Sequence, residues 1–314
     1  MEARLRQVAV CIGQGCNLRC TMCPNLPRFE RLRPKFMAIG QIVRVFEWAA
    51  QLGVPEVRPH AIGEPTIHPG FERIMAAAAA AGVGVRLDAT NGSRLYAIDW
   101  RAWDNPRHAA LVVSIDTGCE ATYEALRGAG TWERLWHGMD LLGQHLADLP
   151  RLRLTVRAIL MRRTATELEA LAQRLEGRAH ALQVVHLREM RGFDGQSLQG
   201  EPDAVRTISA RLRGVCETVG LDYDPVIEHT LGVALGCRER TEGRVCVAPY
   251  QQLRVALTGD CAPCINLDGA GIYCGNVHGS TLREVWEGTG YRRLRYAYDH
   301  GQIPPVCADC VVRR

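Results

Sequence analysis

Three cysteines near the start of the chain have the spacing of a metal-binding loop. They are Cys16, Cys20 and Cys23 in the segment CNLRCTMCP, with glycines just before them and Pro24 just after. Three thiolates can hold three irons of a [4Fe-4S] cube and leave the fourth iron open to a small molecule. The same spacing also fits the buried face of a helix. Because glycine and proline flank the segment and disfavour a helix, the pattern indicates a cluster-binding loop.

Three further motifs each follow a strand-like run. They are Gly63-Glu64-Pro65, Thr90-Asn91-Gly92 and Ser114-Ile115-Asp116. In the first, a carboxylate suits a cationic ligand, and a glycine lets the backbone approach a ligand closely. Taken singly, the second is typical of a turn and the third of a helix cap. Their order behind successive strands makes a shared ligand site the better interpretation.

Together with the cysteine loop, these motifs resemble those of the radical S-adenosylmethionine (SAM) enzymes. The resemblance implies that Gly63 and Glu64 receive the methionine ammonium of SAM, and that Ser114 and Asp116 contact its ribose. Asn91 joins the same cofactor-binding set. A further candidate is Arg157, which could pair with the SAM carboxylate, although a structural ion pair explains it equally well.

Strand-like and helix-like stretches alternate along the first two thirds of the chain at the pace of βα units. The expected strands are Val8–Ile12, Glu56–Ala61, Val83–Ala89, Ala109–Ile115, Arg153–Leu160 and Leu182–Leu187. The expected helices are Ile39–Leu52, Phe71–Ala81, Tyr96–Trp103, Trp132–Leu146, Ala165–Leu175 and Asp203–Val219. Six such units match the partial (β/α)6 barrel of the resembled family, an α/β fold with its chemistry at the carboxyl ends of the strands.

The composition changes after about Leu221, where Gly, Pro and Cys become frequent. We expect a barrel over residues 1–220, a connecting segment over 221–245 and a small cysteine-rich domain over 246–314. In that domain Cys246, Cys264, Cys307 and Cys310 resemble the ligands of a twitch domain, a shortened relative of the SPASM domain. The resemblance implies one auxiliary [4Fe-4S] cluster with all four irons closed by thiolates. A zinc ribbon with the same four cysteines is the alternative.

Two other thiols in this region, Cys261 and Cys274, are candidate catalytic residues. Cys261 lies three residues before a presumed ligand and could be a spare thiol at the barrel mouth. A thiol hydrogen is weakly held and could be returned to a carbon radical. An inert buried cysteine, or a cluster ligand replacing Cys264, is the competing interpretation.

The resemblance also implies the chemistry. One electron from the reduced first cluster cleaves SAM, and the 5′-deoxyadenosyl radical removes hydrogen from an unactivated C–H bond. With one auxiliary cluster, the chain is most similar to twitch enzymes that modify aminocyclitols and aminoglycosides in antibiotic pathways. Hydrogen return from a cysteine would epimerise a carbinol carbon, whereas loss of a proton and of an electron to the auxiliary cluster would give a ketone. We expect epimerisation, with dehydrogenation as the alternative and peptide modification as a weaker one.

Charge and hydropathy narrow the class of partner. Lys and Arg exceed Asp and Glu by only 38 against 34, so no strong field favours nucleic acid, and no apolar run approaches a membrane span. We expect a cytoplasmic enzyme that takes a carbohydrate-like substrate and electrons from a flavodoxin or ferredoxin type of donor. Glu189 and Asp194 follow the sixth strand and could bind an amino sugar, although a solvated loop is the favoured interpretation of each alone. A non-catalytic iron–sulfur or zinc protein is the alternative class, although it would not need the motifs after the cysteine loop.

Overall fold

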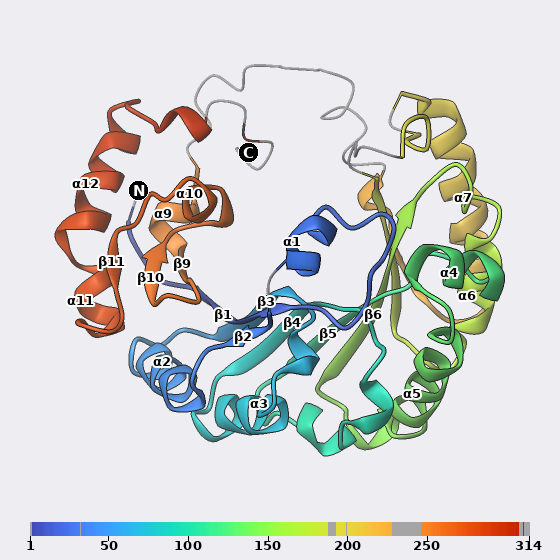
Figure 1. Ribbon diagram of the computed structural model, residues 1–314, viewed down its shortest axis with the longest axis horizontal. Helices are drawn as coiled ribbons and strands as arrows, with labels where there is room; N and C mark the ends of the chain where they lie inside the picture. Colours follow the sequence, from blue (N-terminus) through green and yellow to red (C-terminus); the bar gives the residue numbers. More distant parts are fainter. Residues whose placement is uncertain are drawn as a thin grey trace.

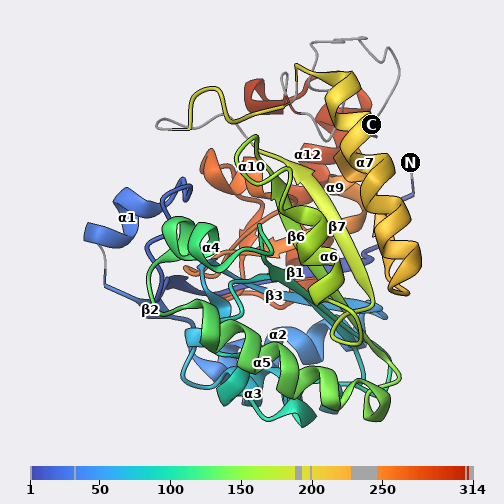
Figure 2. The same cartoon turned by 90° about the vertical axis from the view of Figure 1, so that its right-hand side faces the viewer.

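One curved sheet organises the computed structural model, which describes residues 2–31, 33–187, 193–198, 200–227, 246–307 and 310. The strand order is β11-β10-β9-β1-β3-β4-β5-β6-β7-β8, with β2 (Lys35–Phe36) beside β1. Figures 1 and 2 show most of the helices covering the outer, convex face of the sheet. The opposite, concave face carries the polar side chains that form the site.

All six expected barrel strands are present and parallel. They are β1 (Gln7–Gly15), β3 (Glu56–Gly63), β4 (Gly84–Thr90), β5 (Ala109–Ser114), β6 (Leu152–Leu160) and β7 (Ala181–His186). Successive side chains along a strand point to opposite faces of the sheet, so each strand presents apolar residues to the helices and polar residues to the concave side. On β6, Leu154 and Val156 are fully buried against the helices, while Thr155 and Arg157 lie on the concave side and are partly exposed.

The outer helices form where apolar residues recur at helical spacing. They are α2 (Ile39–Gln51), α3 (Phe71–Ala80), α4 (Glu120–Arg127), α5 (Trp132–Gln144), α6 (Leu168–Arg174) and α7 (Pro202–Thr218). In α2, for example, Ile42, Val45, Phe46 and Ala49 face the sheet and are completely buried. The short helix α1 (Leu26–Arg31) differs from these, because it follows the cysteine loop and lies over the concave side (Figure 1).

The helix expected over Tyr96–Trp103 is wrong. The segment forms two short 3₁₀ helices, η2 (Leu95–Ala97) and η3 (Trp100–Trp103). Asp99 separates them, because its carboxylate accepts a hydrogen bond from the Arg101 backbone N–H at 3.0 Å and so caps a new helix instead of continuing the old one. A second departure is β8 (Asp222–Asp224), which pairs with β7 in parallel although the barrel was expected to end near residue 220.

The cysteine-rich region continues the barrel sheet. It contains α9 (Ala248–Gln251), β9 (Gln252–Val255), β10 (Asp260–Ala262), α10 (Ile265–Gly269), β11 (Gly275–Asn276), α11 (Leu282–Trp286), α12 (Thr289–Asp299) and η5 (Pro305–Cys307). β9 pairs in parallel with the first half of β1, from Gln7↔Gln252 to Val10↔Val255. This pairing joins the C-terminal region to the barrel along the first half of the strand that ends at the cysteine loop (Figure 1).

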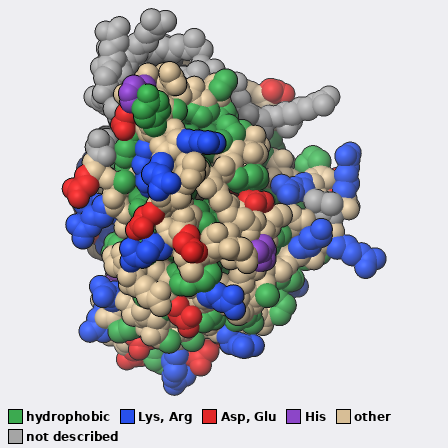
Figure 3. Space-filling view, turned by 90° about the vertical axis from the view of Figure 1, so that its left-hand side faces the viewer, with side chains coloured by type: hydrophobic (Ala, Val, Ile, Leu, Met, Phe, Trp, Pro, Cys, Tyr) green, Lys and Arg blue, Asp and Glu red, His purple; other side chains and the backbone are tan. Residues whose placement is uncertain are grey.

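The surface of the C-terminal side is mixed in charge. Figure 3 shows basic and acidic side chains interspersed on this face. Within the described ranges, no helix is long and apolar enough to cross a membrane.

Candidate active site

The cysteine loop begins where β1 and β3 touch through their backbones. Gly63 has a φ of +127°, and a Cβ added there would lie 2.0 Å from the carbonyl oxygen of Gly15. The next residue, Glu64, donates its backbone N–H to the same carbonyl at 2.9 Å. The glycine of the Gly-Glu-Pro motif is therefore required by close backbone packing directly before Cys16.

The Glu64 carboxylate is buried and joins the ends of β3 and β4. It accepts hydrogen bonds from the Thr66 backbone N–H at 3.0 Å, the Thr90 hydroxyl at 2.6 Å and the Asn91 backbone N–H at 2.6 Å. Burial raises the pKa of Glu64, and these hydrogen bonds offset the rise only in part. In this arrangement the Glu64 side chain holds together the loops that follow β3 and β4.

Asn91 connects the end of β4 to the first cysteine. Its amide nitrogen lies 3.0 Å from the Asn17 side-chain oxygen and 3.7 Å from the Cys16 sulfur. Asn17 in turn donates to the Ser93 hydroxyl at 2.8 Å. The Thr-Asn-Gly motif therefore lies beside the cysteine loop, as the order of the motifs predicted.

The other end of the loop is held by α4. The backbone N–H of Thr21 donates to the Leu126 carbonyl at 2.8 Å. Beneath it, Asp116 is completely buried and bonds the Arg127 guanidinium, with the shorter contact at 2.5 Å. The second Asp116 oxygen accepts the Ile159 backbone N–H at 3.0 Å. Because both carboxylate oxygens have internal partners, the structure favours a positioning role for this side chain over direct contact with ribose.

The three loop thiols are close enough to influence one another. Burial raises the pKa of Cys16 and of Cys20, and each is affected further by the neighbouring thiols. Thiolates are the ligands of iron and zinc, so metal binding here would displace protons. Among the described residues, no three Cys, His, Asp or Glu side chains surround a single metal-ion position. The loop carries three thiols and is held by contacts with three strands and a helix. Three thiolates on one loop fit a cluster with one open iron.

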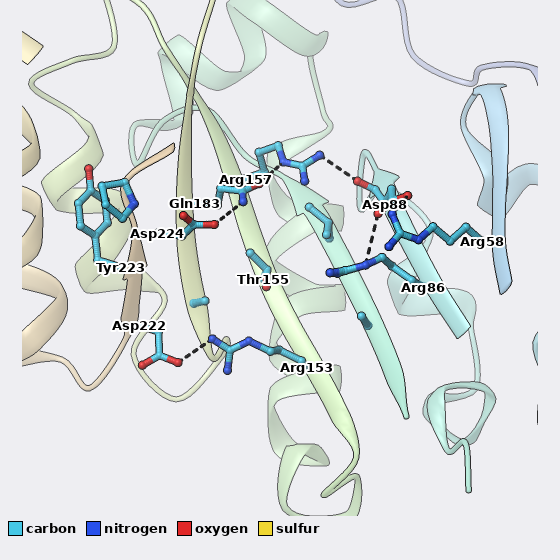
Figure 4. Close-up of a pocket in the computed structure, with 14 residues that line it drawn as sticks. Arg58, Arg86, Asp88, Arg153, Thr155, Arg157, Gln183, Asp222, Tyr223 and Asp224 are labelled. Carbon is cyan, nitrogen blue, oxygen red and sulfur yellow. Dashed lines mark hydrogen bonds and ion pairs between the residues drawn. The ribbon is translucent and has the colours of Figure 1, made fainter. Parts of the chain in front are cut away.

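Below this loop, the concave face holds a cavity of about 740 Å³. Its centre is open because Ala110, Val112, Thr155 and Ala181 are small. Larger charged side chains surround them, as Figure 4 shows: Arg58, Arg86, Asp88, Arg153, Arg157, Asp222 and Asp224.

Arg157 links the cavity to the loop. It lies on β6 beside Ser114 of β5. Two residues further on, Ile159 packs in the apolar cluster that Cys20 joins. Arg157 therefore lies two residues before the part of β6 that packs near the cysteine loop. Arg157 donates to the Gln183 side-chain oxygen at 2.5 Å and to the Asp88 carbonyl at 3.0 Å. Within the described chain it forms no ion pair, so its charge remains available to an anion.

The four presumed auxiliary ligands also come together. The pKa of Cys246 is raised, chiefly by burial and then by Cys264, Cys310 and Cys307. Cys307 lies in a small apolar cluster that Cys246 and Cys264 border. Two polar side chains contact the sulfurs: the Tyr298 hydroxyl at 2.9 Å from Cys307, and the Asn266 amide at 3.2 Å from Cys310. This set lies in the C-terminal region, as expected.

Cys261 is not at the barrel mouth. It lies on β10 between Val255 and Gly275, is fully buried, and belongs to the main apolar core. Burial raises the pKa of its thiol to about 12. Cys274, whose pKa burial raises to about 11, packs at the edge of the same core, and its backbone N–H donates to the Cys261 carbonyl at 2.7 Å. Neither thiol lines the cavity, so we do not retain either as a hydrogen donor.

Several residues of the site were missed or fall elsewhere. Arg127, Gln183 and Asp224 were not singled out, because each becomes important only through strand register or helix packing. The sequence signal that could have identified Gln183 and its neighbours is the alternation of polar and apolar residues along β6 and β7. Asp194 lies in an exposed turn and does not line the cavity. Glu189 lies outside the described residues.

The close contact at Gly63 yields a testable prediction. Gly63→Ala should lower stability by about 1–3 kcal/mol, because the backbone must leave a strained geometry and displace Gly15. It should also reduce iron retention by the cysteine loop, measured after anaerobic reconstitution. The matched control is Gly128→Ala, which has a φ of +114° but open space around the new Cβ. Equal iron retention in the two variants would contradict the packing argument.

Comparison with known proteins defines the class. Residues 10–175, more than half of the chain, match the radical SAM superfamily, and residues 246–311 match SPASM, an iron–sulfur cluster-binding domain. The chain therefore belongs to the radical SAM superfamily and carries a SPASM-type domain. Its cofactors are SAM, a [4Fe-4S] cluster in the first region and an auxiliary iron–sulfur cluster in the second.

Individual known proteins resemble this chain over part of their length or at low sequence identity. A GTP 3′,8-cyclase of Pectobacterium atrosepticum is 32% identical over 132 residues, 41% of this chain and 40% of the cyclase. The chain spans about half the length of the curated relatives it matches. SuiB of Streptococcus suis bound to SAM superposes with a TM-score of 0.68 at 16% identity, over 99% of this chain and 72% of SuiB. Native anSMEcpe with bound AdoMet gives 0.63 at 17% identity, over 91% and 82%. These structural similarities confirm the partial barrel. None of the names of these proteins refers to the sugar chemistry that the sequence analysis expected.

Proposed function

We propose that this enzyme oxidises a secondary alcohol of an amino sugar or aminocyclitol to a ketone. The observation that carries the proposal is the cavity on the concave face below the cysteine loop, which presents guanidinium and carboxylate groups together. An apolar substrate would remove water from these charged groups without replacing its hydrogen bonds, at a cost of several kcal/mol. A small molecule with hydroxyl and amino groups would satisfy them.

The chain's residues have distinct roles in this proposal. Cys16, Cys20 and Cys23 hold the first cluster, and Gly63, Glu64, Asn91 and Ser114 form the loops around SAM. Arg157 is placed to bind the SAM carboxylate. When bound, the cluster and SAM together supply a carbon radical that removes a hydrogen atom from the substrate. The small residues at the cavity centre leave room for that substrate, and the charged ones around them orient it.

Dehydrogenation is favoured over epimerisation by the position of the thiols. Hydrogen return needs an S–H group that reaches the substrate, but no cysteine of the described residues lines the cavity. The alcohol would therefore lose one hydrogen atom, and then one proton and one electron, to become a ketone. An auxiliary cluster held by Cys246, Cys264, Cys307 and Cys310 would supply the acceptor for that electron.

The auxiliary ligands can be tested by metal content. We propose a barrel domain, now including β8, and an auxiliary domain from residue 246 whose ligands are Cys246, Cys264, Cys307 and Cys310. The reconstituted protein should hold about eight irons, and Cys264→Ala should lose about four of them, since a cube lacking one ligand is labile. About four irons plus one zinc in the unchanged protein would instead identify a zinc ribbon.

Product analysis tests the function. The anaerobically reconstituted protein, reduced by dithionite or flavodoxin, is incubated with SAM and a panel of aminocyclitols and amino sugars. A substrate should increase 5′-deoxyadenosine and give a product two mass units lighter. A product of unchanged mass with one solvent deuterium in deuterium oxide would instead indicate epimerisation, and no response from any panel member would reject the substrate class.

GTP is the second candidate substrate. It is favoured by the names of the curated relatives and by four arginines around the cavity. However, three of these arginines already contact aspartates, which leaves less positive charge for a triphosphate. GTP therefore belongs in the same panel, where its turnover would replace the amino-sugar proposal.

A further inference from the structure

Three neighbouring strands place a cation, an amide and an anion in a row on the cavity wall. Arg157 of β6 is registered with Gln183 of β7, which is registered with Asp224 of β8. Gln183 accepts from Arg157 through its side-chain oxygen at 2.5 Å and donates to Asp224 through its amide nitrogen at 2.5 Å. Figure 4 shows the three side chains together on the concave side.

This arrangement keeps the two charges apart. Registered residues on adjacent strands are about 5 Å apart, so Arg157 and Asp224 stand on strands separated by roughly 10 Å. Gln183 occupies the space between them, and its two hydrogen bonds fix which end of the amide faces each charge. Arg157 and Asp224 are thus held without collapsing into an ion pair.

The other carboxylates on the cavity wall already have cationic partners. Asp88 lies 3.6 Å from both Arg58 and Arg86, and Asp222 lies 2.6 Å from Arg153. Asp224 is half-buried, and over the described part of the chain it forms no ion pair. Among the described residues, the direct hydrogen-bond partner of this half-buried carboxylate is a neutral amide and not a cation, which suits Asp224 to a cationic ligand.

We propose that Asp224 binds the ammonium group of the substrate and so selects amino-bearing over neutral cyclitols. The inference rests on the proposed function and deepens it, because it names the residue that recognises the amino group. Gln183 is a positioning residue that fixes the Asp224 carboxylate.

The test compares binding and turnover of two probes by the reconstituted protein with SAM. One probe is the aminocyclitol 2-deoxystreptamine, and the other is the matching cyclitol with hydroxyls in place of the amino groups. Asp224→Asn should raise KM and Kd for the aminocyclitol by roughly 10- to 100-fold and leave those for the neutral probe nearly unchanged. The control is Asp203→Asn on α7, an exposed carboxylate that is paired with Arg206 and does not line the cavity, and it should leave KM and Kd for both probes unchanged.

The possible outcomes distinguish a failure of the role of Asp224 from a failure of the proposed function. If the unchanged protein turns over both probes with equal KM, or if Asp224→Asn leaves the aminocyclitol KM unchanged, the role of Asp224 is wrong while the proposed function stands. If neither probe is bound or turned over, the substrate class fails, and the role of Asp224 fails with it. Iron content and unfolding midpoint of Asp224→Asn should equal those of the unchanged protein, and a fall in either would assign the residue a structural role instead.

Discussion

Replacing Cys20 with alanine should abolish cleavage of SAM, and Cys16→Ala and Cys23→Ala should do the same. Each variant removes one of the three thiolates that leave the fourth iron open, and the chain has no fourth cysteine in this loop to take its place. The fold should remain, because backbone hydrogen bonds at Gly15 and Thr21 hold the loop and do not depend on the thiols. The measurement is 5′-deoxyadenosine formed per chain under reducing, anaerobic conditions.

A matched control separates loss of a ligand from loss of any thiol. Cys119 is half-buried at the start of α4 and has no cysteine at metal spacing, so Cys119→Ala should keep its iron and its SAM cleavage. Undiminished cleavage by Cys16→Ala, Cys20→Ala or Cys23→Ala would contradict the assignment of the loop. It would also reopen the possibility of a non-catalytic metal protein.

Asp116→Ala should destabilise the protein by about 3–5 kcal/mol. The change leaves Arg127 buried without its carboxylate, and breaking a buried ion pair from one side has this cost. The change also removes the acceptor for the Ile159 backbone N–H, so a hydrogen bond of β6 is lost as well. The measurement is anaerobic urea unfolding of the cluster-free chain, so that differences in iron content do not contribute.

A double replacement tests the physical reason. Asp116→Leu with Arg127→Met removes both charges and keeps apolar volume, so it should recover a large part of the stability lost in Asp116→Ala. Because α4 holds the loop through Leu126, Asp116→Ala should lose iron from the first site as well. A change in stability below about 1 kcal/mol in Asp116→Ala would show that the pair is not structural, and would return Asp116 to the candidates for direct SAM contact.

Much of the barrel could be predicted from sequence because its signals are local. Runs such as Val8–Ile12 are apolar over a strand's length, and Ile42, Val45, Phe46 and Ala49 repeat at helical spacing. The cysteine loop and the three motifs lie at strand ends, so a parallel sheet necessarily brings them to one edge. The failed helix over Tyr96–Trp103 shows the limit, since one aspartate side chain redirected the backbone there.

The cavity chemistry could not be predicted in the same way. Cys261 was assigned from its distance along the chain to Cys264, but β10 pairs between β9 and β11 and turns its thiol into the core. Asp224 lies within the expected connecting segment, 221–245, and it reaches the cavity because β8 pairs with β7. Both outcomes depend on strand pairing between distant segments, which periodicity does not reveal.

The most direct test of the proposed reaction follows one deuterium atom. An aminocyclitol labelled with deuterium at the carbinol carbon is incubated with SAM and the reduced, reconstituted enzyme. We expect the deuterium in 5′-deoxyadenosine, together with a ketone that has lost the label. Unlabelled 5′-deoxyadenosine, or a product that keeps the alcohol and gains solvent hydrogen at an inverted carbon, would contradict dehydrogenation at this site.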